Sequence, residues 1–163
     1  AYLKERWEKP GSRYHVMKEM FACLHKLEVL SADWPKKVRH YEKVLFGGGR
    51  KQYEALHQYR MPDKIAEQLL SYFIYVYFAG AVYDGMPYSK VKLAVSSTML
   101  IEDMVCAKAA EKGQLSFEAI ADAAHSYARE VEHSDLNLQR LSTMFRHQKC
   151  FHIGRLCGAL LEW

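Results

Sequence analysis

Hydrophobic positions are densest between Leu69 and Tyr83, the longest apolar run in the chain, which only Ser71 interrupts. Many of its residues favour strands locally, so a buried strand of about 4–8 residues is the alternative interpretation. We favour a helix, because a helical lead-in begins at Asp63 directly after Pro62 and continues into the run. A helix this apolar is buried on most sides. The pattern therefore predicts a central buried helix over residues 63–83. Its apolar run, the 15 residues from Leu69 to Tyr83, is too short and too rich in tyrosine for a membrane span of about 20 residues.

Apolar residues recur at helical spacing in the other segments too, and capping residues, glycine or proline bound most of these segments. The predicted helices cover residues 12–30, 34–46, 50–60, 90–112, 117–133, 136–145 and 150–163, and residues 2–8 have the character of a helix end. The N-cap residues are expected to be Ser12, Asp33, Ser89, Ser116 and Ser134, and Gly113 is expected to close the 90–112 helix. The prediction is an all-α fold, an irregular bundle of about seven or eight helices around a buried central helix.

Composition narrows the class of protein. The 163 residues fit one domain with a real core, and 50% hydrophobic and 26% charged residues are ordinary for a globular protein. The chain begins with Ala1 in helical character, so we expect a single helical domain, 1–163, that is the C-terminal fragment of a longer protein. No secretory leader precedes the four cysteines, which favours a reducing, cytoplasmic setting.

The net charge of +4 permits an acidic partner and does not call for nucleic acid. Basic side chains gather on one side of the 34–46 helix: Lys36, Lys37, Arg39, His40 and Lys43. They form either a solvated helix face or a surface that docks an acidic protein partner. The second interpretation makes the chain a non-catalytic interaction module, which we keep as the alternative function.

The densest polar cluster is the segment 126–134, where Arg129, Glu132 and His133 stand within five residues. Arg129 suits an anion or carboxylate clamp, and Glu132 and His133 suit proton handling. The structural alternative is that Arg129 pairs with Glu132 and that His133 caps a helix end. His125 shares a helix face with His133, but eight residues of helix separate them by about 12 Å, too far for one metal ion.

Two other sets of side chains carry weaker signals. The spacing of His147, Cys150, His152 and Cys157 matches no usual zinc pattern, and both cysteines fit an apolar helix stripe, so no metal site is predicted. The tyrosines in and around the central run form either an aromatic pocket or core with hydroxyls at its edge. They are Tyr72, Tyr75, Tyr77, Tyr83 and Tyr88.

Three stretches together resemble the C-terminal half of the bacterial lysine-N-methylase family that methylates flagellin. The stretches are 67–78 with Pro87 and Tyr88 after it, 109–120, and Ser126–Ser134 with Asn137 and Leu141 after it. The similarity covers about residues 62–145 and is strongest at Arg-x-x-Glu-His. The family's cysteine-rich N-terminal region, associated with an iron–sulfur cluster, has no counterpart here, so a cluster is expected only in that missing region.

The resemblance implies transfer of a methyl group from S-adenosylmethionine to lysine amines of flagellin. A lysine amine attacks only when neutral, so Glu132 or a tyrosine hydroxyl is the candidate acceptor of its proton, and Glu132 and His133 are the candidate catalytic residues. Arg129 is the candidate for the cofactor's carboxylate, and the aromatic faces of Tyr75 and Tyr88 are candidates for its sulfonium. We expect the 63–83 and 116–133 helices to touch, with a tyrosine hydroxyl near Arg129 or His133.

Overall fold

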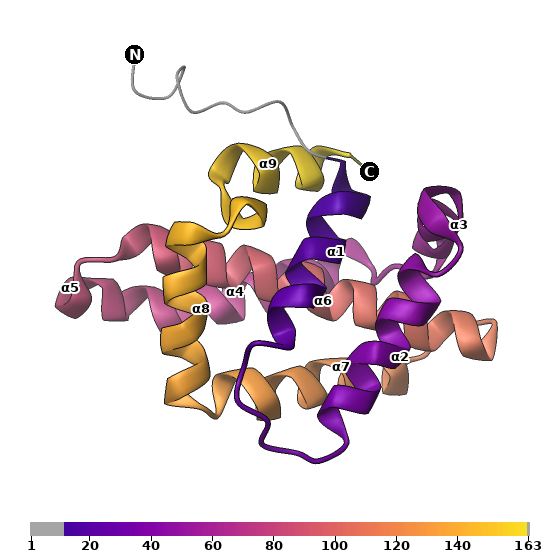
Figure 1. Cartoon of the computed structure of the whole chain (residues 1–163), viewed down its shortest axis with the longest axis horizontal. Helices are drawn as coiled ribbons and strands as arrows, with labels where there is room; N and C mark the ends of the chain where they lie inside the picture. Colours follow the sequence, from indigo (N-terminus) through magenta and orange to yellow (C-terminus); the bar gives the residue numbers. More distant parts are fainter. Residues whose placement is uncertain (1–11, 163) are drawn as a thin grey trace.

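The computed structural model describes residues 12–162, and these residues contain helices and no strand (Figure 1). The α-helices are α1 (Arg13–Leu24), α2 (Trp34–Phe46), α3 (Gly49–Leu56), α4 (Asp63–Tyr77), α5 (Ala81–Asp84), α6 (Pro87–Lys112), α7 (Phe117–Tyr127), α8 (Asp135–His147) and α9 (Ile153–Leu161). With the one-turn α5 counted as an extension of α4, the described residues form eight helices, which confirms the all-α prediction. The helix end predicted over residues 2–8 lies outside the described residues.

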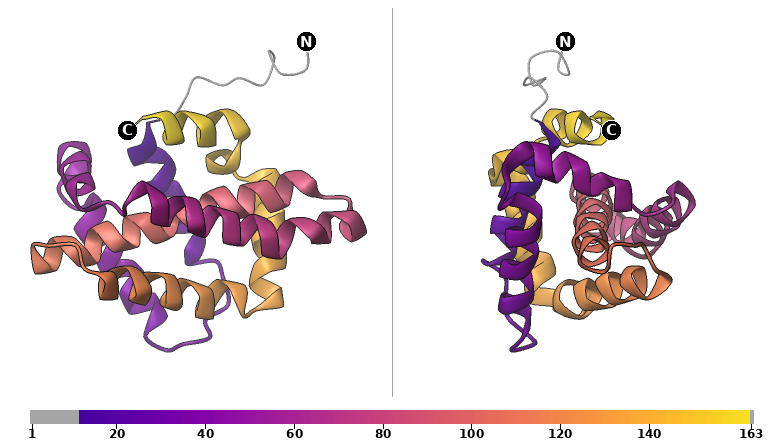
Figure 2. Two further views of the ribbon diagram at one scale, coloured as in Figure 1. Left: turned by 180° about the vertical axis from the view of Figure 1, so that it is seen from behind. Right: turned by 90° about the vertical axis from the view of Figure 1, so that its right-hand side faces the viewer.

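The central helix of the bundle is α6 and not the 63–83 segment. α6 runs through the middle of the molecule, with α1, α2 and α8 on one side and α4 on the other (Figures 1 and 2). Its buried residues include Met99, Leu100, Met104 and Val105, each at most 2% exposed. Because α6 is 26 residues long, about 39 Å, it reaches every other layer of the fold.

The prediction that helix 63–83 is buried on most sides is wrong. α4 runs antiparallel to α6 across the back of the molecule, and no helix of residues 12–162 covers its outer side (Figure 2). Of its residues only Phe73 is buried, while Tyr75 is 86% exposed and, beyond the 3-10 turn Phe78–Gly80, Tyr83 is 92% exposed. Only one long helix can occupy the centre of the bundle. α6, with 26 residues against the 15 of α4, is the longer and packs against more of the other helices.

The exposed segment Asp63–Asp84 is, by length and apolar composition, the one helical stretch in the described part of the chain that could cross a membrane. It is 22 residues long, and 6% of its most apolar window is buried. One side packs along α6, and Phe73 lies at the centre of that contact. The segment is therefore a surface helix of the folded domain with an uncovered apolar side.

Most helix ends follow the local signals. Ser116 Oγ accepts a hydrogen bond from the amide of Ala119, and Ser134 Oγ accepts one from Asn137, as expected of N-caps. Several boundaries differ, among them the start of the last helix, α9, which begins at Ile153 and not at Cys150. α6 begins at Pro87, two residues before Ser89, because proline is favoured in the first turn. α1 stops at Leu24 and not near residue 30.

A glycine closes α6 in the left-handed conformation, with φ +68° at Gly113. We expect Gly113→Ala to lower the free energy of unfolding by about 1 kcal/mol, because a Cβ is disfavoured at positive φ. Gly80 is the matched control, since its φ of −61° is helical and an added Cβ meets only Lys90 at ordinary contact distance. Gly80→Ala is expected to be neutral or slightly stabilising, by about 0.5 kcal/mol. Urea unfolding of the two variants measures the difference, and equal losses contradict the prediction.

Candidate functional site

The carboxylate of Glu132 lies where the helical segment that follows α7, Ala128–Glu132, meets α4. Tyr72 and Tyr77 on α4 both donate their hydroxyl to Glu132 Oε2, each at 3.0 Å. The ring of Phe73 meets the ring of Tyr127 edge-on, with centroids 6.4 Å apart. α4 and α7 thus touch through side chains, as expected, although each packs mainly on α6. The residue that receives the tyrosine hydroxyls is Glu132, and not the expected Arg129 or His133.

The two tyrosines act as hydrogen-bond donors and not as bases. Burial raises the pKa of Tyr77, and the Glu132 carboxylate raises it further; the same two causes act in the same order on Tyr72. Both phenols therefore keep their protons at neutral pH. Within this cluster, Glu132 is the group able to accept a proton, and its side chain is only partly buried, so it remains accessible.

The side chains beneath Glu132 and its two tyrosines are buried. Tyr127 is 1% exposed, and its hydroxyl shares a 2.8 Å hydrogen bond with Ser97 Oγ on α6. Burial raises the pKa of Tyr127 as well. These contacts fix the end of α7, and with it the position of the residues that follow.

Glu132 stands in a π-helical segment, Ala128–Glu132, which directly continues α7. Such segments insert an extra residue into a helical turn and often occur at functional sites. Here the buried Glu130 accepts hydrogen bonds from the amides of Leu30 and Ser31, at 3.0 and 3.2 Å. Asn137 Nδ2 donates to the Glu130 carbonyl at 2.6 Å. The segment is thereby tied to the loop after α1.

The same hydrogen bonds explain why α1 ends early. The amide of Glu28 donates to Asn137 Oδ1 at 2.6 Å, and the amides of Leu30 and Ser31 donate to Glu130. These amides are satisfied from α8 and the π-helical segment, so the chain leaves the helix without leaving donors unpaired. Part of the Ser126–Ser134 motif is therefore structural, and the sequence interpretation missed Glu130 and Asn137 as its anchors.

The structure separates the three polar residues singled out in the sequence. Arg129 donates from Nη2 to Ser31 Oγ at 3.0 Å, and its Nε lies 3.9 Å from Glu130 Oε1, so it faces the loop after α1. Glu132 faces α4. His133 ends the π-helical segment, with its amide donating to the Ala128 carbonyl at 3.1 Å, and its side chain is exposed. The Arg129–Glu132 pairing of the structural alternative is replaced by the pairing with Glu130.

The structure does not bring the other proposed cofactor residues to Glu132. Tyr75 on α4 is 86% exposed and Tyr88, in the first turn of α6, is 77% exposed. A ligand the size of S-adenosylmethionine is normally held in a pocket that covers most of its surface. Side chains so exposed do not enclose such a ligand by themselves, and Arg129 is already paired. Cofactor binding by Arg129, Tyr75 and Tyr88 stays a prediction.

The basic residues of α2 line a shallow hollow of about 270 Å³ between α2 and α6. Its lining consists of Lys36, Lys37, His40, Tyr41, Lys108 and Glu111. His40 and Glu111 pair across it. Docking of an acidic partner on these basic residues stays a prediction.

The cysteines lie in the packed interior. Cys23, Cys106 and Cys150 are buried, and Cys157 is partly buried. Cys23 on α1 and Cys150 after α8 lie beside each other, and the interaction between the two thiols lowers the pKa of Cys23. They join two distant parts of the core as a pair of small, mostly apolar side chains.

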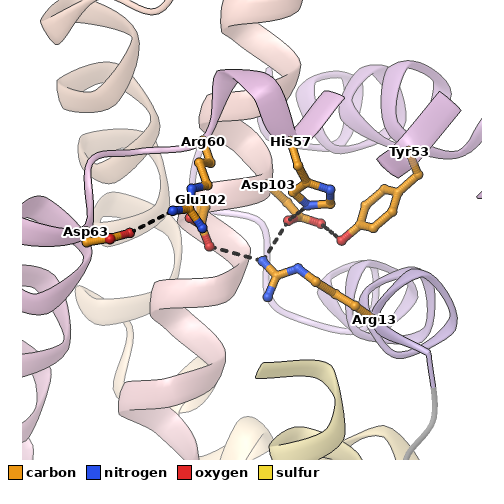
Figure 3. Close-up of polar contacts among 7 residues, drawn as sticks. All are labelled: Arg13, Tyr53, His57, Arg60, Asp63, Glu102 and Asp103. Carbon is orange, nitrogen blue, oxygen red and sulfur yellow. Dashed lines mark hydrogen bonds and ion pairs between the residues drawn. The ribbon is translucent and has the colours of Figure 1, made fainter. Parts of the chain in front are cut away.

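A buried ion network that the sequence interpretation missed lies where α1 and α3 meet α6 (Figure 3). Arg13 Nη2 is 3.1 Å from Glu102 Oε2 and 3.2 Å from Asp103 Oδ1, and Tyr53 donates its hydroxyl to Asp103 Oδ2 at 2.8 Å. His57 Nε2 lies 3.8 Å from Asp103 Oδ1. Arg13 is 2% exposed and Asp103 fully buried, so the network is closed to substrate and fastens α1 and α3 to α6.

One sequence signal for this network exists. Glu102 and Asp103 interrupt the apolar residues of α6 between Ile101 and Met104. Two adjacent carboxylates in a buried helix require a cation, because unpaired buried charges are costly. Burial raises the pKa of Glu102, and the charge of Arg13 opposes that rise. The pattern predicts a cationic partner but does not say which of the 23 lysines and arginines supplies it.

Comparison with known proteins gives one match. The model of the family described as the FliB lysine N-methylase C-terminal domain matches residues 3–159. The matched range includes Glu132 with its two tyrosines, as well as the Arg13 network. No curated protein and no solved structure matches the chain.

Proposed function

Because this chain belongs to the family of FliB lysine N-methylase C-terminal domains, we propose that it is part of a protein-lysine N-methyltransferase that acts on flagellin. The methyl donor in this proposal is S-adenosylmethionine, which supplies the methyl group. The observation that supports the chemical part is the accessible Glu132 carboxylate, held by the hydroxyls of Tyr72 and Tyr77. Such a site suits the cationic end of a lysine side chain.

The first requirement of the reaction is a neutral amine. A lysine ammonium carries no lone pair, so its proton must leave before the nitrogen attacks a methyl group. Glu132 is the acceptor: the proton passes from the lysine Nζ to a carboxylate oxygen, and the lone pair is left on nitrogen. Tyr72 and Tyr77 keep that carboxylate oriented while their ring faces line the approach of the cation. The carboxylate is only partly buried, so the proton then leaves it to solvent.

The test is methylation of flagellin by the complete methylase that carries Glu132→Gln. The substitution keeps the shape of the side chain and its hydrogen-bond acceptor for the tyrosines, but it removes the base. We expect the rate constant for methyl transfer to fall by about 100-fold or more, the usual contribution of a general base. Single-turnover mass spectrometry of the flagellin lysines measures the rate.

Glu118→Gln is the matched control, since Glu118 is an exposed glutamate in the first turn of α7. Its rate is expected to equal that of the unchanged enzyme, and circular dichroism checks that both variants are folded. Raising the pH is expected to restore part of the Glu132→Gln rate, because the substrate amine then loses its proton without help. A Glu132→Gln enzyme with full activity at neutral pH removes Glu132 from the mechanism.

A further inference from the structure

The outer side of α4 and α5 carries a row of large apolar side chains with nothing packed on it in the described part of the chain. Its members are Tyr72, Ile74, Tyr75, Val76, Phe78, Val82 and Tyr83, exposed by 41–92%, and we call them the outer apolar face. No charged residue occurs between Glu67 and Asp84. Weighted by these exposed fractions, and with about 150–250 Å² for one whole aromatic side chain, the face presents on the order of 800 Å² of surface.

An uncovered surface of this size marks an interaction site. It also approaches what one partner contributes to a stable interface, about 800 Å². Its chemistry narrows the choice of partner. Permanent interfaces resemble a protein core and lack charge, whereas surfaces that meet a partner briefly are more polar. The outer apolar face is of the first kind, because it is uncharged and four of its seven side chains are aromatic.

The ends of the segment argue against a lipid surface as the partner. Helices that lie on membranes carry lysine or arginine along the polar side. Here Asp63 and Lys64 flank one end and Asp84, paired with Lys90 at 2.6 Å, flanks the other. Glu67 adds a further carboxylate, so the segment carries no net positive charge and anionic lipid gains nothing from this helix.

The face is continuous with the Glu132 cluster. Tyr72 belongs to both, because the residue is 48% exposed while its hydroxyl donates a hydrogen bond to Glu132. Whatever covers the face therefore comes to lie beside the carboxylate. The chain belongs to a family of C-terminal domains of a lysine N-methylase. In the complete enzyme, an amino-terminal part therefore precedes such a domain.

We propose that the outer apolar face is the surface on which the amino-terminal part of the same methylase packs, as an interface permanent within one polypeptide. The partner presents a complementary apolar surface of similar area, and its docking completes the wall of the site at Glu132. The proposal rests on the family assignment and on the exposed residues, and not on the chemistry assigned to Glu132.

Hydrogen–deuterium exchange of this chain alone and of the complete methylase tests the proposal. We expect amides of residues 72–84 to exchange at least about tenfold more slowly in the complete enzyme, because packing suppresses local opening. In the complete enzyme, Tyr75→Glu with Tyr83→Glu is expected to abolish that protection. Phe117→Glu is the matched control, since Phe117 is 77% exposed on α7, outside the face, and it is expected to leave the protection unchanged.

The experiments also distinguish the other partners that would cover the outer apolar face. Equal exchange in the short and complete chains overturns the proposal, as does protection that survives the double variant. A dimer of this chain, detected by light scattering and broken by the double variant, assigns the face to a second copy instead. Binding of this chain to neutral phospholipid vesicles, lost in the double variant, assigns it to a membrane. Slow exchange of residues 72–84 in the complete Glu132→Gln enzyme shows that docking on the face does not depend on the catalytic role proposed for Glu132.

Discussion

Replacement of Arg13 by alanine is expected to lower the free energy of unfolding by about 3–5 kcal/mol, because it removes the guanidinium that lies against two buried carboxylates. Glu102 and Asp103 lie 3.1 and 3.2 Å from Arg13 Nη2 and are 7% and 0% exposed. Domains of this size are stable by only about 5–15 kcal/mol. Urea unfolding followed by circular dichroism is therefore expected to show a much lower midpoint at neutral pH.

Two comparisons separate the lost charge pair from lost packing. Neutralising the acids in the same background, with Glu102→Gln and Asp103→Asn, is expected to recover part of the loss, since those buried negative charges are then gone. Arg50→Ala, in an exposed pair with Glu54, is expected to leave the midpoint nearly unchanged. Equal midpoints for the Arg13→Ala and Arg50→Ala variants contradict this account of the network.

Alkaline pH is expected to destabilise the fold strongly, because several tyrosines hold their protons more tightly in the folded state. Burial, followed by the charges of Asp122 and Glu111, raises the pKa of Tyr41 to about 12. Burial raises the pKa of Tyr53, Tyr77 and Tyr127 too. In the unfolded chain tyrosines lose their protons near pH 10, so from there upward the unfolded state binds fewer protons and stability falls.

For Tyr41 alone, a pKa raised from 10.0 to about 12 corresponds to about 3 kcal/mol, fully present below pH 10 and lost as the pH rises to about 12. Urea unfolding at a series of alkaline pH values, with tyrosinate absorbance recorded in parallel, measures the loss. Tyr41→Phe is expected to flatten this dependence, and Tyr75→Phe, at an exposed tyrosine, is expected to leave it unchanged. Titration of all eleven tyrosines near pH 10 in a folded protein contradicts the prediction.

The residues where helices start and stop are determined largely by the sequence. Ser116, Ser134 and Gly113 act within one turn of their own position, through a side-chain oxygen or a left-handed backbone. Such signals are local and can be read without knowing the fold. The resemblance to the methylase family was also present in the sequence, because it rests on residue types in order.

Only the tertiary structure decided which apolar helix is central. Both α4 and α6 are long helices with many apolar residues. Hydrophobic periodicity shows that a helix has apolar positions to bury, but it does not show how many other helices pack against it. Likewise α1 ends at Leu24 because Glu130 and Asn137, about 100 residues later, take up the amides that follow it. No local pattern around residues 25–31 contains that information.

The polar clusters divide in the same way. Glu132 was recognisable as a candidate from its own segment, but its tyrosine partners, Tyr72 and Tyr77, stand 60 and 55 residues earlier. Asp103 and Arg13 are 90 residues apart. Side-chain chemistry is fixed by the sequence, whereas a hydrogen bond or ion pair needs two groups within about 3 Å, and for distant residues the packing of helices alone brings them that close.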